Sequence, residues 1–291
     1  MGGWQQLRAD DVSLHEQIGG GGVALVYRGT FGGRSVAVKT LFDPKVDEAL
    51  KQEYMDELLV MSELSHPNVV TFIGACMTPP TLYFAMELCE NSLFERIHGS
   101  QRIRCDPLGE RDKMRLALDV ARGMQYLHGR SPAVVHRDLK SHNVLEARDG
   151  TMKICDFGLV RTKNTTAGTP AYMAPELLSG GMFSGAVDVY AFGITLCELF
   201  SGELPFRGWD YMDIRRKVTA GDRPELPRFD CPDDVRDLIR RCWDHSPKGR
   251  PSFDEAVRVL DGRLATTRDK SHCDELDSLD ALDALDSMMR K

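Results

Sequence analysis

The sequence predicts an α+β fold of two lobes, in which an antiparallel sheet with one helix precedes a mainly helical part. In the first third of the chain, stretches rich in β-branched and aromatic residues alternate with glycine-containing turns, which is typical of antiparallel strands. Elsewhere, apolar residues recur at intervals of three and four, which indicates helices. With 291 residues, of which 42% are hydrophobic, the chain can bury a sizeable core.

Five stretches are predicted to form the strands of the first lobe. Residues 12–18, 24–31 and 34–41 read VSLHEQI, ALVYRGTF and RSVAVKTL, and the turns between them predict a meander. Residues 69–76 and 81–88, VVTFIGAC and TLYFAMEL, return to strand character after one helix. That helix is expected over residues 46–64, where one face carries Leu50, Tyr54, Leu58, Met61 and Leu64.

Two long helices are predicted in the second lobe. Residues 111–130 repeat apolar side chains on one face, namely Leu116, Val120, Met124 and Leu127. Residues 187–200 (VDVYAFGITLCELF) are apolar almost all round, as in a central buried helix. We therefore place the lobes at residues 10–88 and 89–264, followed by an acidic leucine-repeat tail at residues 265–291.

Charge and cysteine content narrow the functional class. The net charge of −7 argues against a broad nucleic-acid or membrane surface, so neither is expected as a partner. The eight cysteines occur singly, which is typical of reduced thiols in a cytoplasmic protein. The sequence has no apolar run of the roughly 20 residues that span a bilayer, and its N-terminus lacks the hydrophobic segment of a signal peptide.

The strongest chemical signal is the stretch VVHRDLKSHNV, which has the spacing H-R-D-L-x-x-x-N. Phosphoryl transfer needs a carboxylate that orients the attacking hydroxyl and accepts its proton, and an amide oxygen that helps to hold Mg²⁺. Asp138 is the candidate for the first role and Asn143 for the second. A DFG triplet follows with Asp156 as a further Mg²⁺ ligand, and an APE triplet ends the series at Glu176.

These motifs occur in the order found in eukaryotic protein kinases, which the chain resembles from about residue 10 to residue 264. The resemblance implies a two-lobed kinase fold that binds ATP and Mg²⁺ in the cleft. Lys39 of VAVK matches the lysine that holds the α- and β-phosphates. Its expected partner is Glu57 on the following helix, and Glu53, one turn earlier, is the competing candidate.

The resemblance also assigns an adenine pocket. Met86 falls at the gatekeeper position, and Glu87 to Cys89 form the hinge whose backbone should bond adenine. Ordinary core packing is the alternative interpretation of the apolar residues that would enclose the ring, which are Ile18, Val26, Ala37 and Leu145.

Other matches are structural supports. They comprise the regulatory spine (Met61, Phe72, His136 and Phe157), the ion pair that anchors the activation segment (Glu176 and Arg250), and the aspartate that holds the catalytic loop (Asp188).

The glycine-rich run IGGGGVALVYRG departs from the kinase pattern G-x-G-x-x-G-x-V, because Ala24 replaces the third glycine. Gly19 and Gly21 still allow backbone N–H groups to approach phosphate. An alanine adds a steric penalty of about 1 kcal/mol only where φ is positive. We therefore expect a working nucleotide lid that is stiffer at one point.

The motifs also indicate the substrate. Lys140 after the catalytic aspartate, and Thr169 in GTPAYMAPE, resemble the serine/threonine pattern. HPNVVTFIGAC and DVYAFGI are similar to the tyrosine-kinase-like group, especially Raf-like and mixed-lineage kinases, which suggests a signalling kinase that acts on other kinases. Dual-specificity and tyrosine kinases remain alternatives. A pseudokinase would lack one of the catalytic residues, and a Walker or Rossmann protein would show other motifs.

Two features are candidates for regulation. Arg137, directly before Asp138, would receive a phosphate from Thr165 or Thr166 in the activation segment. The tail repeats apolar residues with aspartates between them, at Leu276, Leu279, Leu282, Leu285 and Met288. We favour a disordered acidic tail, and a helix that docks on a partner, on another protomer or on the kinase itself is the alternative.

Overall fold

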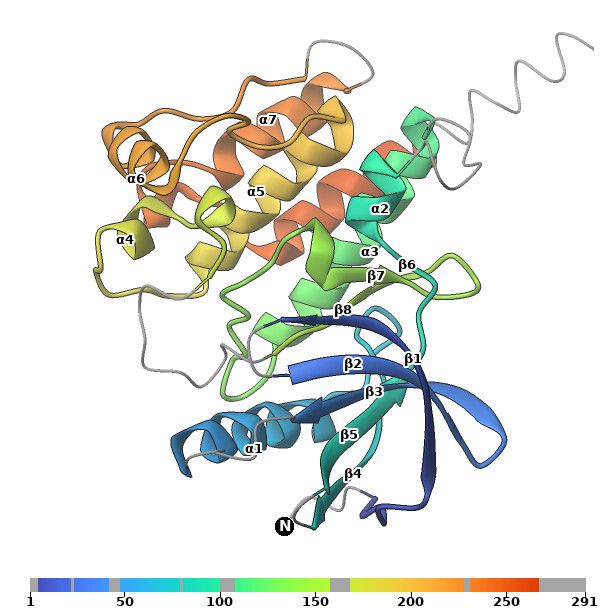
Figure 1. The fold of residues 1–291 in the computed structure, drawn as a ribbon. Helices are drawn as coiled ribbons and strands as arrows, with labels where there is room; N and C mark the ends of the chain where they lie inside the picture. The colour runs from blue at the N-terminus through green and yellow to red at the C-terminus, as the bar shows by residue number, and fades with distance from the viewer. Residues whose placement is uncertain are drawn as a thin grey trace, which may run out of the picture.

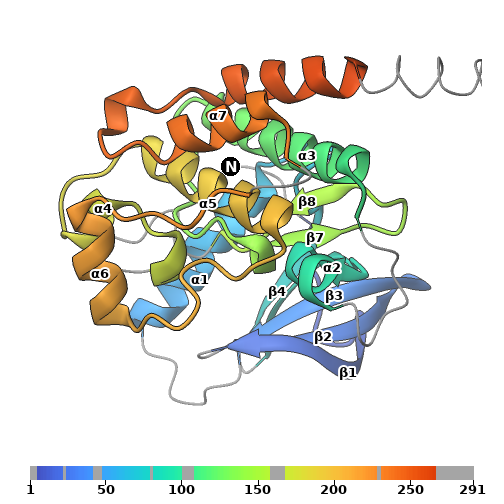
Figure 2. The same cartoon turned by 90° about the horizontal axis from the view of Figure 1, so that it is seen from above.

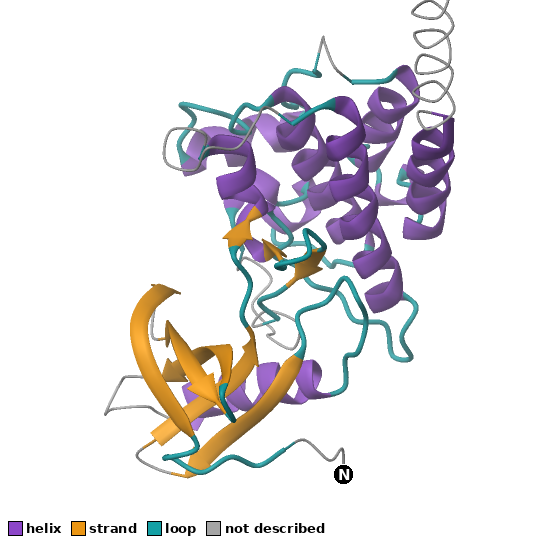
Figure 3. Ribbon diagram, turned by 90° about the vertical axis from the view of Figure 1, so that its right-hand side faces the viewer, coloured by secondary structure: helices purple, strands orange, loops and turns teal. Residues whose placement is uncertain are grey.

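A computed structural model describes residues 5–21, 24–41, 48–78, 81–99, 108–157, 168–227 and 231–266. These residues form two lobes, one with a sheet and helix α1 and one that is mainly helical (Figure 1). Figure 3 shows the same division, with the long strands gathered in the first lobe and the other helices in the second. The predicted α+β class, with the sheet first, is confirmed.

The first lobe is built on an antiparallel sheet with the strand order β1-β2-β3-β5-β4. Its strands are β1 (Val12–Gly21), β2 (Ala24–Phe31), β3 (Arg34–Leu41), β4 (Phe72–Thr78) and β5 (Thr81–Glu87). All five predicted strands are present, but β4 begins later than the predicted residue 69. The reason is that Val69 pairs with Ile154 of the second lobe, and Val70 N donates to the Ile154 carbonyl at 2.9 Å.

Helix α1 (Glu48–Ser62) interrupts the sheet where a helix was predicted. Leu58 and Met61 are buried, as the periodicity predicts, whereas the side chains of Leu50 and Tyr54 lie outside the described residues. The helix ends before the predicted Leu64, because the N–H groups of residues 63 and 64 donate to carbonyls three positions back and tighten the chain. Leu64 is nevertheless buried.

A segment before β1 extends the sheet beyond β4. Leu7 N donates to the Ala75 carbonyl at 2.8 Å, and Ala75 N donates to the Gln5 carbonyl at 3.1 Å. The Leu7 side chain is buried in the cluster that covers the outer face of the sheet. Gly74 permits this approach, because a Cβ there would lie 2.6 Å from the Gln5 carbonyl oxygen. These contacts lie before residue 10, where the sequence predicts that the lobe begins.

The second lobe begins with a small sheet of β6 (Asn91–Ser92), β7 (Val144–Glu146) and β8 (Met152–Ile154). Its helices are α2 (Leu93–His98), α3 (Glu110–His128), α4 (Pro175–Leu178), α5 (Ala186–Ser201), α6 (Tyr211–Ala220), α7 (Asp233–Cys242) and a last helix over residues 253–266. Short 3₁₀ turns are η1 (Ser141–Asn143), η2 (Pro170–Tyr172) and η3 (Pro247–Gly249).

Helix α5 occupies the middle of the second lobe, surrounded by α3, α6 and α7 (Figure 2). Every residue from Val187 to Phe200 is buried, which confirms the prediction of a central helix. Gly193 lets α7 approach, since a Cβ there would lie 2.7 Å from Cβ of Cys242. The four predicted apolar residues of α3 are also buried. None of the helices in the described part of the chain combines the length and apolarity needed to cross a membrane.

Candidate active site

The catalytic loop, residues 136–143, is anchored on the central helix through Asp188 of α5. The Asp188 carboxylate is fully buried and accepts the backbone N–H groups of His136 at 2.8 Å and Arg137 at 2.7 Å. Arg137 has a φ of 72°, an unfavourable value for a residue with a side chain. His128 of α3 lies 2.8 Å from the same carboxylate. A loop in a costly conformation is therefore held by several bonds from one buried carboxylate.

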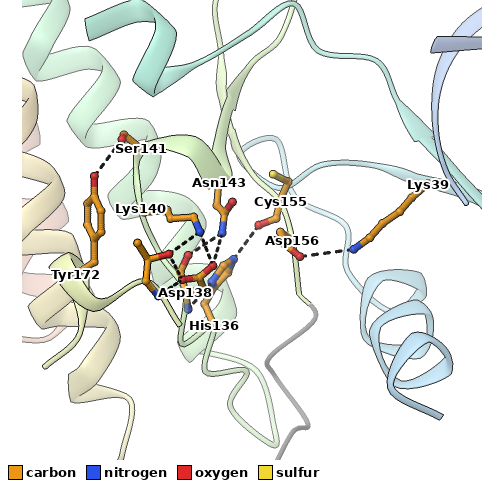
Figure 4. A network of polar contacts seen from close by, with 10 residues as sticks. Lys39, His136, Asp138, Lys140, Ser141, Asn143, Cys155, Asp156 and Tyr172 are labelled. Carbon is orange, nitrogen blue, oxygen red and sulfur yellow. Dashed lines mark hydrogen bonds and ion pairs between the residues drawn. The ribbon is translucent and has the colours of Figure 1, made fainter. Parts of the chain in front are cut away.

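Asp138 lies at the centre of a polar network (Figure 4). Its Oδ1 accepts from both the backbone N–H and the hydroxyl of Thr169, at 2.9 and 3.0 Å. Its Oδ2 accepts from Lys140 Nζ at 2.8 Å and from Asn143 Nδ2 at 3.1 Å. Lys140 Nζ also donates to the Thr169 hydroxyl at 2.6 Å. The predicted position of Thr169 against Asp138 is confirmed, and both oxygens of the carboxylate have defined directions.

His136 links the catalytic loop to the DFG triplet. Its Nε2 lies 2.9 Å from the Cys155 carbonyl oxygen, which can only accept, so Nε2 carries the proton. Nδ1 then accepts from the Asp138 N–H at 3.3 Å. The His136 and Phe157 rings lie 5.3 Å apart, and Met61 belongs to the same buried cluster, with Phe72 packed against it. The four residues of the predicted spine thus contribute to one apolar core.

Lys39 of β3 is paired with Glu57 of α1, the partner that the sequence predicts. Lys39 Nζ donates to the two carboxylate oxygens of Glu57 at 2.6 and 2.7 Å, and it lies 3.6 Å from Asp156 Oδ1. Figure 4 shows Asp156 between Lys39 and the catalytic loop. The competing candidate Glu53 has a side chain outside the described residues.

Burial and charge act in opposite directions on the Lys39–Glu57 pair. Burial alone would lower the pKa of the Lys39 ammonium, but the charges of Glu57 and Asp156 raise it. Burial raises the pKa of the Glu57 carboxyl, and Lys39 offsets this only in part. Lys39 therefore stays charged and can hold an anion in the cleft.

The strand register places three residues of the predicted adenine pocket, Val26, Ala37 and Met86, on neighbouring strands. Val26 pairs with Lys39, and Ala37 pairs with Met86 of β5. Ala37 is buried, whereas Ile18 remains 43% exposed at the end of the sheet. Leu145 in β7, Val26 and Met86 are half-buried. These apolar groups come from both lobes.

The hinge follows β5. Its Cys89 is half-buried, and burial raises the pKa of the Cys89 thiol to about 12, so the thiol stays protonated at neutral pH. Glu87 N donates to the Thr71 carbonyl at 2.9 Å, and the Glu87 carboxylate accepts from Thr71 N at 2.6 Å.

The glycine-rich run forms the end of β1 and the start of β2. Gly19 pairs with Val26, and Gly21 pairs with Ala24, so the described parts of the run are antiparallel neighbours. Gly20 has a φ of 149°, which favours glycine. A Cβ on Gly19 would lie 3.8 Å from Cβ of Val26, which is an ordinary van der Waals contact. Ala24 begins β2, where strand geometry accepts alanine.

The proposed metal ligands supply only oxygen atoms. Asn143 uses its Nδ2 to donate to the Asp138 carbonyl at 2.8 Å, which leaves its amide oxygen as an acceptor. Asp156 has a φ of 66°, and its side chain is 45% exposed. Carboxylate and amide oxygens next to a phosphate site are the ligands that Mg²⁺ prefers, so these residues fit the ion.

The activation segment is anchored at its end by Glu176 and Arg250. The guanidinium donates to the two carboxylate oxygens at 2.6 and 2.9 Å, and the Arg250 side chain is fully buried. Arg137 is also buried, its guanidinium 4.3 Å from the centre of the Phe183 ring, and burial lowers its pKa. Thr165 and Thr166 lie outside the described residues.

Sequence reasoning did not single out Glu198, Phe183 or the segment before β1. Glu198 is a buried carboxylate of α5 in contact with the catalytic loop. No local pattern marks these residues, because their partners lie far away in the chain. The only available signal was a glutamate within a mainly apolar helix.

A two-lobed α+β fold that places a strand lysine beside a helix glutamate and a DFG aspartate, with the HRD aspartate close by (Figure 4), defines the protein kinase class. Residues 12–260 match the family model described as protein tyrosine and serine/threonine kinase. The chain belongs to this family.

Curated relatives agree with the family. The chain is 40% identical over 263 residues to a probable serine/threonine-protein kinase of Arabidopsis thaliana, covering 86% of this chain and 25% of that protein. It is 37% identical to a dual specificity protein kinase of Dictyostelium discoideum, over 88% of this chain and 52% of the relative. Mitogen-activated protein kinase kinase kinase 10 of Mus musculus is 37% identical, over 88% of this chain and 28% of the relative. The chain thus spans between a quarter and about half of these relatives.

Proposed function

We propose that this chain is an ATP- and Mg²⁺-dependent protein kinase that transfers the γ-phosphoryl group to serine or threonine of protein substrates. The observation that carries the proposal is the contact of Asp138 with both Lys140 and the Thr169 hydroxyl. It combines a proton acceptor with a cation and with an aliphatic hydroxyl at hydrogen-bond distance. A carboxylate that can accept a hydroxyl proton, with a cation beside it, supports transfer to a serine or threonine hydroxyl.

Asp138 orients the acceptor hydroxyl and takes its proton as the oxygen attacks phosphorus. Lys140, 2.8 Å from Asp138, places a positive charge beside the transferred group. Asn143 fixes the carboxylate through its amide N–H groups. Catalysis here is positioning and charge stabilisation, and Asp138 performs the only proton transfer that we assign to the protein.

Lys39 would hold the α- and β-phosphates, with Glu57 fixing its ammonium. Adenine would lie between the hinge and the apolar groups of Ile18, Val26, Ala37 and Leu145, below the gatekeeper Met86. Gly19 and Gly21 would bring backbone N–H groups to the phosphates. Asn143 and Asp156 would hold Mg²⁺, which neutralises phosphate charge.

We infer that the physiological substrates include downstream kinases and that the protein acts in a cytoplasmic signalling cascade. The mouse relative is named as a mitogen-activated protein kinase kinase kinase, which supports this inference. Dual specificity is the second candidate, because the Dictyostelium relative is named as a dual specificity kinase. We propose no nucleic-acid or membrane partner, in keeping with the net charge of −7.

The test is a transfer assay with radiolabelled ATP and a set of purified candidate proteins, including inactive kinases, followed by phospho-amino-acid analysis. We expect phosphoserine and phosphothreonine. Predominant phosphotyrosine would overturn the assignment, and phosphate on all three residues would favour dual specificity.

The role of Asp138 is tested by Asp138→Asn. We expect transfer to fall by about 10² to 10⁴, because the proton acceptor is lost, while nucleotide affinity changes less than about threefold. Asp149→Asn, at an exposed carboxylate of the β7–β8 turn, is the matched control. An active Asp138→Asn variant would remove Asp138 from the proposed role.

A further inference from the structure

The carboxylate of Glu198 in α5 is completely buried and is shared by three distant segments. Its Oε1 accepts from the Ser141 hydroxyl at 3.0 Å and lies 3.0 Å from His98 Nε2. Its Oε2 accepts from the Tyr172 hydroxyl at 2.8 Å. A buried carboxylate is stable only if such donors compensate for lost hydration, so each of these bonds matters.

Two of the donors lie in segments next to Asp138, namely the catalytic loop and η2. Ser141 follows Lys140 directly in the catalytic loop, and Tyr172 lies in η2, the turn that begins after Thr169. Their hydroxyl oxygens lie 3.3 Å apart, and Figure 4 shows this contact beside the Asp138 network. Burial, reinforced by the Glu198 charge, raises the pKa of Tyr172, so its hydroxyl stays protonated and donates. Glu198 thus holds the catalytic loop and η2 relative to each other.

The third donor, His98, comes from outside these parts. It is the last residue of α2, the helix that follows the hinge, and its side chain is 18% exposed. The Phe94 ring lies 4.8 Å from the His98 ring and 3.8 Å from that of His142. The Phe94 and His98 rings pack at an interplanar angle of 50°, and this contact limits the rotation of the imidazole and therefore the direction of its bond to Glu198.

We propose that His98 is a positioning residue for phosphoryl transfer. Its bond to Glu198 Oε1 fixes the rotation of the carboxylate, and the carboxylate in turn keeps Ser141 and Tyr172 in the arrangement that aligns Lys140 and Thr169 with Asp138. The helix after the hinge is thereby coupled to the catalytic loop. The proposal rests on the proposed kinase function for its kinetic consequence, although its structural part does not.

The test compares His98→Leu, which removes the donor but keeps most of the volume, with His98→Gln, whose amide can place an N–H near the position of Nε2. We expect His98→Leu to lower kcat with a protein acceptor about tenfold, because one acceptor site of a buried carboxylate loses its donor. The KM for ATP should change less than about twofold, since Lys39 and the glycine-rich run, which would hold the phosphates, lie on other elements than His98. His98→Gln should restore at least half of the wild-type kcat.

A double-mutant cycle with Tyr172→Phe separates positioning from general destabilisation. If both residues act through Glu198, the loss in the double variant will be smaller than the product of the two single losses. A loss in the double variant that equals the product of the two single losses would overturn the proposal. A His98→Gln variant as impaired as His98→Leu would also overturn it.

Hydrogen–deuterium exchange provides a readout that does not depend on activity. In His98→Leu, we expect faster exchange in peptides that cover residues 139–145 and 168–174, and wild-type exchange in peptides from β1 to β3. Unchanged exchange in both peptides would refute the positioning role even if the wild type is a kinase. Absence of transfer by the wild type, with the exchange change present, would instead refute the proposed function.

Discussion

At the scale of single residues, the cleft contains a carboxyl group whose protonation is coupled to the stability of the fold. Glu57 is buried beside Lys39, and burial raises its pKa above the ordinary value of 4.5. The folded protein therefore binds a proton on Glu57 at a pH where the unfolded chain has already released it. Between these two pKa values, stability rises as pH falls.

This coupling predicts a pH dependence that Glu57→Gln removes. As pH falls from neutral towards the ordinary glutamate pKa of 4.5, the Tm of the wild type should move upward relative to the Tm of the variant, because only the wild type takes up the proton on residue 57. Thermal unfolding at a series of pH values measures the difference. Glu63→Gln, at the exposed turn after α1, is the control. A Tm difference that does not vary with pH would contradict the raised pKa.

The residues to which we propose catalytic roles could be located from the sequence because short motifs carry them. Asp138 and Asn143 lie in one loop, so their spacing in the sequence already determines that they are close together. Lys39 and Glu57 are separated by a strand and a helix, and only the family resemblance identified the pair. Glu198 and His98 were not predictable, because their contact joins α2 to α5 and neither residue belongs to a motif.

At the scale of elements, the end of the activation segment depends on one buried ion pair. Arg250 is fully buried and also donates to the Asp244 and Ala186 carbonyls, both at 2.9 Å. Removing its carboxylate partner Glu176 leaves a buried guanidinium without charge compensation. Such a loss costs several kcal/mol, in contrast to the loss of an exposed pair.

We therefore expect Glu176→Ala to lower the free energy of unfolding by about 3 kcal/mol. Asp261→Ala is the matched control, because it removes the partner of Arg122 in a pair whose side chains are 44% and 60% exposed. The control should cost less than about 1 kcal/mol. Urea unfolding measures both. Equal costs would show that burial does not strengthen the Glu176 pair.

A second prediction at this scale concerns the middle of the activation segment. Phosphate on Thr165 or Thr166 would add a charge of about −1.5 to −2 and form charge-assisted bonds with Arg137. After incubation with ATP, mass spectrometry should find phosphate on one of the two threonines. The double variant Thr165→Ala/Thr166→Ala should lose most activity, and Thr162→Ala should keep it. Full activity of the double variant would exclude this switch.

The bounds of the predicted elements differ from the observed ones where contacts between residues far apart in the sequence determine the structure. Val69 has a strand-like sequence, yet it pairs with Ile154 in place of β5, because the chain must join the two lobes there. Gln5 and Leu7 carry no strand signal, and they extend the sheet because Gly74 leaves room for them. The pattern of apolar residues predicts α3 and α5 well. Helix α3 buries one face and α5 buries nearly all its faces, so the sequence of each helix reflects its burial.

At the scale of the whole molecule, the cleft depends on two connections between the lobes. One is the hinge after β5. The other is the segment around Asn68, whose carbonyl accepts from Ile154 N at 3.0 Å and whose Nδ2 donates to the Met152 carbonyl at 3.0 Å. Both connections reach the small sheet that continues into Asp156. The distance between Lys39 and Asp156 is therefore controlled by bonds that cross from one lobe to the other.

The acidic tail is predicted to be dispensable for this architecture. The described chain ends in the helix over residues 253–266, which lies beside α3 (Figure 2). Its buried contacts come from Phe253, Ala256 and Leu260, and Arg263 bonds Glu110 of α3 at 3.1 Å. All these anchors precede Thr266. The alternating leucine and aspartate residues beyond it lie outside the described residues.

A protein that ends at Thr266 should therefore keep its Tm within about 2 °C, because all the buried anchors of the described helix are retained. Its transfer activity should stay within about twofold of the wild type, and its mass by light scattering should correspond to the same oligomeric state. The matched control keeps the full length and replaces Leu276, Leu279, Leu282 and Leu285 by serine, which removes the apolar stripe but not the charge. A change in activity or in oligomeric state that both proteins share would show that the stripe docks as a helix, on the kinase or on a second protomer.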